Sequence, residues 1–174
     1  PADQNIEALL PLCLLENLTD AVIAQTTDGV IASWNPAAER LFGYTAQEVI
    51  GKPFSILLPP ESAPELPGFL MKIWTGQRIE GFDTMRVRKD GHCADASLAL
   101  GPIKAASGQI VGAIGIMRDI AQRKKVEAEL WDSEEQFREL ALHIRQVFWM
   151  IDETETKVHY ISPAYEKVWG RTCE

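Results

Sequence analysis

The chain has 174 residues, of which 46% are apolar and 24% are charged, a composition typical of a folded globular protein. At roughly 150 residues per domain, this length predicts one complete domain and a remainder. The net charge of −8 argues against a nucleic-acid partner, because a phosphate backbone would be repelled.

The N-terminal residues 1–19 are predicted to form an amphipathic helix. Leucines recur there at three-residue intervals, and Pro11 interrupts the pattern. Two strands follow at residues 21–26 and 30–34, separated by the turn sequence Thr27-Asp28-Gly29. This part of the chain therefore predicts a β-hairpin behind a short helix.

Two short helices are predicted next from their capping residues. Asn35 followed by Pro36 favours a helix start, and Gly43 is a natural left-handed helix end. Thr45 and Glu48 then have the spacing of a capping box, which predicts a second short helix.

A proline-rich segment and three strands complete the first domain. The prolines of residues 59–67 exclude regular helix there, and helical spacing resumes over residues 68–76. Apolar alternation and turn sequences then predict strands at residues 79–88, 92–103 and 109–118. Three strands in series predict an antiparallel meander.

A single long helix is predicted from Asp119 to about Gln146, because this stretch lacks Gly and Pro and is rich in Glu, Lys, Arg and Gln. Its apolar residues recur at steps of three and four, which predicts a coiled-coil seam between two helices. The alternative is a surface helix packed on its own domain. The seam consists of Val126, Leu130, Ser133, Phe137, Leu140 and Ile144.

The end of the chain repeats its beginning. Residues 162–170 match residues 35–43 in class at a constant offset of 127 residues, including the proline, the glutamate and the final glycine. Upstream, residues 148–152 and 158–161 are similar to the first two strands. The long helix is therefore predicted to join two copies of one module.

No catalytic or metal-binding constellation is apparent in the sequence. His92 and Cys93 are adjacent on a predicted strand, so their side chains point to opposite faces and cannot ligate one metal without distortion. The three cysteines, which include Cys13 and Cys173, form no CxxC motif. A reducing cytoplasm is thus expected, and no apolar run approaches the ~18 residues of a membrane span.

Large apolar side chains of the first domain allow two interpretations. They form an ordinary core, or some of them line a cavity between the sheet and the short helices, where a small ligand would bind. The candidate ligand-binding residues are Trp34, Phe42, Phe54, Phe69, Trp74 and Met85.

Several short motifs carry a resemblance to the PAS family of sensory modules and its C-terminal PAC portion. The motifs span residues 34–44, 48–51, 88–91 and 118–120, in the order and spacing of that family. The resemblance implies an α+β fold: a five-stranded antiparallel sheet in the order 2-1-5-4-3, short helices on one face, and a signalling helix after the last strand.

The resemblance also implies a role, because PAS modules detect a ligand, redox state, light or a partner and bias an output domain through the exit helix. Asp119 and Ile120 match the Asp-Ile-Thr motif that couples the sheet to this helix, although Ala121 replaces the threonine. The predicted coupling residues are Asp119, Ile120, Val126, Leu130 and Phe137.

Departures from the family's cofactor motifs lead us to predict no cofactor. Haem-binding PAS domains have a proximal His in the helix before the third strand, and residues 61–76 contain no His. Photoactive flavin domains have a Cys in that region, which is also missing, and Ile79 stands where redox flavin domains usually place a Trp. Flavin is kept as the weaker alternative, with Trp34 and Trp74 in its favour.

The predicted organisation is a helix at residues 1–19, a PAS/PAC domain at 20–120, a signalling helix at 121–146 and the start of a second PAS domain at 147–174. We expect a cytoplasmic sensory and dimerisation module that forms a homodimer through its flanking helices. It would regulate a histidine kinase or a diguanylate cyclase or phosphodiesterase in the same chain, with no catalysis by these residues. The alternatives are a cofactor-binding sensor and a purely protein–protein interaction module.

Overall fold

The structure is a computed structural model that describes residues 13–60, 66–152 and 158–172. The chain divides into two compact units, Pro1–Gln122 and Arg123–Glu174. Residues 13–17 are helical and residues 18–19 are not, so the helix predicted at 1–19 ends two residues early. Residues 1–12 of that prediction lie outside the described residues, as does Cys173.

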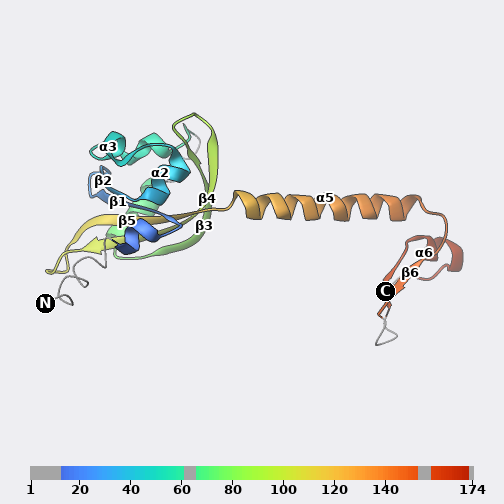
Figure 1. Ribbon diagram of the computed structural model, residues 1–174. Helices are drawn as coiled ribbons and strands as arrows, with labels where there is room; N and C mark the ends of the chain where they lie inside the picture. The colour runs from blue at the N-terminus through green and yellow to red at the C-terminus, as the bar shows by residue number, and fades with distance from the viewer. Residues whose placement is uncertain (1–12, 61–65, 153–157, 173–174) are drawn as a thin grey trace, which may run out of the picture. The chain divides into compact units, whose positions relative to one another are not determined.

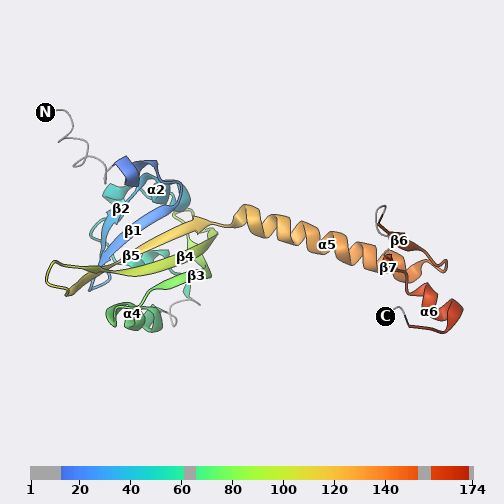
Figure 2. The same ribbon diagram turned by 90° about the horizontal axis from the view of Figure 1, so that it is seen from below.

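The first unit is built on a five-stranded antiparallel sheet in the order β2-β1-β5-β4-β3 (Figures 1 and 2). The predicted fold class and strand order are therefore confirmed. The strands are β1 (Ala21–Thr26), β2 (Ile31–Trp34), β3 (Ile79–Val87), β4 (Cys93–Lys104) and β5 (Ile110–Asp119).

Short helices lie between the second and third strands in sequence and cover one face of the sheet (Figure 1). They are α2 (Pro36–Phe42), α3 (Ala46–Val49), the 3₁₀ helix η1 (Phe54–Leu57) and α4 (Leu66–Trp74). The core between these helices and the sheet is apolar, and its fully buried members include Ile23, Ile31, Phe42, Val49, Leu57, Leu98 and Met117.

The helix starts and ends predicted from capping residues are confirmed. The Asn35 side chain accepts a hydrogen bond from the Ala38 N–H at 2.9 Å, and Gly43 ends α2 with a left-handed φ of 78°. Thr45 and Glu48 form the predicted capping box at the start of α3.

The start of α4 differs from the prediction. The helix begins at Leu66, so Pro67 lies inside its first turn, although the prolines of residues 59–67 were expected to exclude regular helix. A proline is tolerated at that position because the first N–H groups of a helix have no intrahelical acceptor.

The second unit contains most of the long helix α5 (Ala121–His143), followed by β6 (Trp149–Ile151), β7 (Val158–Ile161) and α6 (Ala164–Trp169). The helix ends three residues before the predicted Gln146. The chain there turns into the hairpin, where Phe148 exchanges hydrogen bonds with Ser162: its N–H donates to the Ser162 Oγ at 3.1 Å, and its carbonyl accepts from the Ser162 N–H at 2.9 Å.

The hairpin of the second unit repeats that of the first in register. Ile23 pairs with Trp34 in the first unit as Trp149 pairs with Ile161 in the second, and each first strand has a register irregularity two residues later. Gly170 ends α6 in a left-handed conformation, as Gly43 ends α2.

A pair of tertiary hydrogen bonds is repeated as well. In the first unit the Val22 N–H donates to the Asn35 Oδ1 at 2.8 Å and the Asn35 N–H donates to the Val22 carbonyl at 3.2 Å. Phe148 and Ser162 exchange the equivalent bonds in the second unit. The similarity between the two ends of the chain therefore extends from residue classes to backbone geometry.

Candidate functional site

A small cavity lies between the sheet and the helices of the first unit. Its volume is about 20 Å³, which is room for roughly one ordered water. Two polar side chains, Gln25 and Arg86, and the backbone of Gly115 line it together with apolar residues. The apolar lining residues are Ile23, Phe54, Phe69, Leu70, Leu98 and Leu100.

Two of the six candidate ligand-binding residues, Phe54 and Phe69, line this cavity. Trp34 and Phe42 instead pack against each other in the core, with ring centroids 5.5 Å apart, and the Trp34 Nε1–H donates to the Tyr44 carbonyl at 3.1 Å. Trp74 is half-buried on α4 and does not line the cavity.

Met85 lies on the other face of β3, with 46% of its surface exposed. Its neighbours Thr84 and Arg86 are buried, because successive side chains of a strand point to opposite faces. The assignment of Met85 to a pocket is therefore corrected, and the inward-facing side chain at this end of β3 is Arg86.

Arg86 and Gln25 were not among the predicted site residues. Arg86 is 3% exposed, and its Nη1 donates to the Thr84 Oγ1 at 2.5 Å and to the Met85 carbonyl at 2.8 Å. Gln25 is 8% exposed. A signal was available in the sequence: if Phe82 faces the core, the period of a strand places residues 84 and 86 on the same face.

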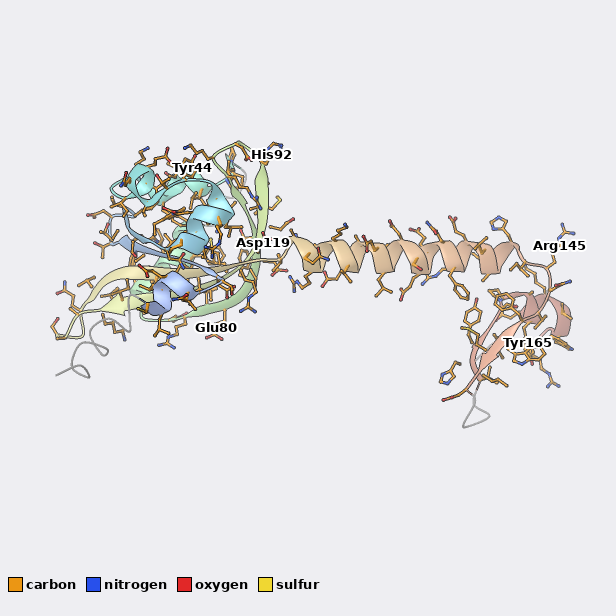
Figure 3. All side chains as sticks on the ribbon, in the orientation of Figure 1. Tyr44, Glu80, His92, Asp119, Arg145 and Tyr165 are labelled. Atoms are coloured by element: carbon orange, nitrogen blue, oxygen red, sulfur yellow. The ribbon has the colours of Figure 1, made fainter. Side chains whose placement is uncertain are left out.

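The predicted coupling residue Asp119 stands where β5 meets α5 (Figure 3). Its Oδ1 accepts a hydrogen bond from the Ala121 N–H at 2.8 Å, and its Oδ2 lies 3.6 Å from the Arg88 Nη2. Ile120 is buried, and its N–H donates to the Asp95 carbonyl at 3.1 Å. Asp119 thus joins the start of the exit helix to the turn between β3 and β4.

That turn is also joined to the short helices. The Lys89 Nζ lies 2.5 Å from the Glu48 Oε1, and the Lys89 N–H donates to the Phe42 carbonyl at 2.9 Å. The hydrogen bond from Lys89, with further bonds from Thr45, lowers the pKa of Glu48 to about 2. Adjacent basic residues therefore connect α3 and the start of α5 through one turn.

The seam residues on α5 are exposed. Val126 and Leu130 lie on the surface, Leu130 with 61% of its area accessible. Phe137 is also exposed, and its ring contacts Tyr160 and Phe148 of the hairpin at centroid distances of 5.3 and 6.5 Å. The predicted seam is thus a solvent-facing apolar stripe, and Phe137 makes two aromatic contacts within its own unit. Ile144 lies one residue beyond the helix end.

The described residues contain no cluster of three side chains suited to hold a metal ion. Over the same part of the chain, no helix combines the length and apolar character that crossing a bilayer requires.

A family model for the PAS fold matches residues 13–120. Two-component system protein A of Emericella nidulans is 36% identical over 118 residues, which is 66% of this chain and 17% of that protein. The signal transduction histidine-protein kinase AtoS of Escherichia coli is 26% identical over 121 residues, or 70% of this chain and 19% of that one. The chain thus spans less than a fifth of these relatives.

Solved structures agree with the family model. The PAS domain of a Colwellia psychrerythraea protein superposes with a TM-score of 0.60 and 28% identity, over 65% of this chain and 96% of that one. An RNA-binding light-oxygen-voltage receptor gives a TM-score of 0.58 and 25% identity, over 76% of this chain and 39% of that one. The chain therefore belongs to the PAS family, as its strand order, its capping residues and its sequence matches all indicate.

Proposed function

We propose that this chain is a sensory and dimerisation module of a larger signalling protein, and that it regulates an output domain through α5. Its similarity to a two-component system protein and a sensor histidine kinase supports a sensory role. The output domain is a histidine kinase or a diguanylate cyclase or phosphodiesterase in this proposal, and catalysis belongs to it. The proposed location is the cytoplasm.

The observation that carries the proposal is the character of α5. Ala141 is the one residue of this helix that is buried, while Val126, Leu130 and Phe137 line an exposed stripe at steps of four and seven residues. A long helix with apolar residues at this spacing is stabilised by packing against a second helix. A second copy of α5 is therefore the proposed partner.

The test compares two neighbouring apolar residues on different faces of α5. Leu130 lies in the stripe, and Trp131 is exposed about 100° further round the helix. Sedimentation of the 174-residue chain should give a dimer. Leu130→Gln should raise the dimer dissociation constant by about tenfold or more, a loss of ~1.4 kcal/mol, and Trp131→Gln should leave it near the wild-type value.

A monomer at roughly 100 μM, a concentration well above a micromolar dissociation constant, would overturn the dimeric arrangement. Equal effects of the two substitutions would show that the stripe is not the interface.

A cofactor-binding sensor is the second candidate. The cavity of about 20 Å³ is far smaller than the ~300 Å³ or more typical of pockets for drug-sized ligands. This difference favours a function without a large cofactor over one that uses flavin or haem. Two measurements distinguish a cofactor-binding sensor from a module without a large cofactor: the absorption spectrum of the purified protein, and mass spectrometry of the small molecules released when it is denatured. A purely protein–protein interaction module is the third candidate, and it predicts that no small molecule binds the first unit.

Residues 147–174 are proposed to be the start of a second PAS domain. The shared strand register, the repeated pair of hydrogen bonds and the left-handed glycine at the helix end support this assignment.

A further inference from the structure

Phe137 of α5 packs against two side chains of the hairpin that follows the helix. Its ring centroid lies 5.3 Å from that of Tyr160 and 6.5 Å from that of Phe148, with interplanar angles of 62° and 85°. Such edge-to-face arrangements are a favoured geometry of aromatic pairs. Tyr160 and Phe148 also contact each other, with centroids 5.8 Å apart. The three rings therefore form one cluster that holds the hairpin against the helix.

The hairpin side of α5 also carries the buried residue of this helix. Ala141 is 1% exposed and lies four positions after Phe137, about 40° further round the helix. Leu140 is about 100° away from Ala141 and is 64% exposed. The second unit thus covers Ala141 and part of Phe137, and leaves Leu140 in solvent.

Phe137 belongs as well to the apolar stripe through which α5 is proposed to dimerise. In a coiled coil each such side chain inserts between four residues of the facing helix. Tyr160 borders the space where those residues would lie, because it lines an open cleft of about 450 Å³ together with Phe137, Ser133, Glu134 and Arg138. A second helix that packed around Phe137 would enter this cleft and meet Tyr160. The hairpin and a second α5 therefore compete for one side chain.

The competition sets how much of the stripe a second helix can use. Before Phe137 the stripe offers only Val126 and Leu130 as apolar positions, because Ser133 is polar. Release of Phe137 adds its own ring and the neighbouring Leu140. Helices are stabilised mainly by the packing of an apolar face, so the longer stripe should give the tighter dimer.

We propose that the hairpin is a brake on the association of α5. While Phe137 packs against Tyr160 and Phe148, a second copy of the chain pairs only along the first part of the helix. Release of the hairpin makes the whole stripe available, so the two packings form a two-state element whose balance sets the strength of the dimer. This inference rests on the proposed dimerisation and names the contact that regulates it.

The test removes the ring of Tyr160, which lies outside α5. Tyr160→Ser in the full 174-residue chain should lower the dimer dissociation constant, measured by sedimentation, by about threefold or more, as the loss of one competing aromatic pair predicts. Trp149→Ser is the matched control, because Trp149 is an exposed aromatic residue of the same hairpin. Trp149 pairs with Ile161 and Met150 with Tyr160, so Trp149 and Tyr160 lie on opposite faces. The control should keep the wild-type dissociation constant.

The sign of the change is diagnostic. Removing exposed apolar surface ordinarily weakens association or leaves it unchanged, whereas release of the brake strengthens it. A dissociation constant for Tyr160→Ser that is unchanged or higher would overturn the proposal, and so would equal tightening by Trp149→Ser.

Leu140→Gln locates the gain on the helix. In the wild type it should change the dissociation constant by less than about twofold, and in the Tyr160→Ser background it should raise the constant by about tenfold or more. The comparison holds even if Tyr160→Ser unfolds the hairpin, because Phe137 is then released as well. Non-specific association of an unfolded hairpin would not depend on Leu140, so equal effects of Leu140→Gln in both backgrounds would contradict the brake.

The outcomes separate this inference from the proposed function. A wild-type chain that dimerises through α5, with no tighter dimer for Tyr160→Ser, would refute the brake and leave the proposed function standing. A monomeric wild type whose Tyr160→Ser variant dimerises would support the brake and overturn dimerisation of the chain with the hairpin in place. Monomers of both proteins would refute the brake and the dimer together.

Discussion

Asn35 shows how one side chain can hold several segments of this fold together. Its Oδ1 accepts hydrogen bonds from the N–H groups of Ala38 and Val22, and its Nδ2 donates to the carbonyls of Leu15 and Asp20. All four hydrogen-bonding positions of the amide are therefore used. One buried residue thus begins α2, fixes the start of β1 and ties down the segment before it.

The ion pair between Glu48 and Lys89 makes a testable contribution to the pH dependence of stability. The pKa of the Glu48 carboxyl group is lowered from 4.5 to about 2 in the folded state. A lowered folded-state pKa means that the stabilisation is present above pH 4.5 and is lost as the pH falls towards 2. Glu48→Gln should therefore unfold with a shallower dependence on pH over this window, as measured by urea denaturation at several pH values.

Lys89→Met provides the partner control for this pH dependence. It should flatten part of the same window, and adding Glu48→Gln to it should remove the remainder, which comes from the hydrogen bonds that Thr45 donates to Glu48. A Glu48→Gln profile as steep as that of the wild type would contradict the assignment.

At the scale of single residues, the sequence predicted the helix-capping residues better than the residues that line the cavity. Asn35, Thr45 and Gly43 could be recognised because capping depends on near neighbours in the chain. The facing of Met85 and Arg86 was missed, although the strand period counted from Phe82 indicates it, because β3 places an arginine inward and a methionine outward, against the usual pattern of polarity. The long aliphatic part of arginine makes this arrangement tolerable in a buried position.

Among the elements, α5 depends on a cap that comes from the strand before it. Asp119→Ala removes both the acceptor for the Ala121 N–H and the carboxylate beside Arg88. It should speed hydrogen exchange of the first-turn amides of α5, with a loss of about 1 kcal/mol of local stability. Asp119→Asn keeps the acceptor and loses only the charge, so it should retain most of the protection.

Similar exchange rates for Asp119→Ala and the wild type would show that the cap does not set the start of the helix. Equal acceleration by both substitutions would instead assign the effect to the ion pair with Arg88.

The boundaries of helices and strands could be predicted from the sequence wherever they follow local signals. The prediction failed where a contact with a distant part of the chain sets the boundary. The strands β1, β4 and β5 were placed to within one residue, because alternation and turn sequences are local. The end of α5 was placed too late, since the hydrogen bonds of Phe148 to Ser162 join segments that are far apart in the chain.

For the whole molecule, the repeat provides two equivalent positions in opposite environments. Phe42 on α2 is fully buried, whereas Trp169, its counterpart on α6, is 54% exposed. Phe42→Ala should therefore cost about 3–5 kcal/mol of stability of the first unit, and Trp169→Ala should change stability by less than about 0.5 kcal/mol. Urea denaturation followed by near-ultraviolet circular dichroism measures both.

A cost for Trp169→Ala as large as that for Phe42→Ala would show that the exposed face of α6 is covered in solution. That result would contradict the surface described for the second unit and point to self-association through it.

The two hairpins keep the same pairing although their lengths differ. Asn35 lies 13 residues after Val22, and Ser162 lies 14 residues after Phe148, yet the register irregularity follows the same paired position in each. The additional residue is absorbed between the strands, where loop length costs little. In evolutionary terms, paired strands and the helix cap form a unit that can be copied intact, while the connection between them is free to accept insertions.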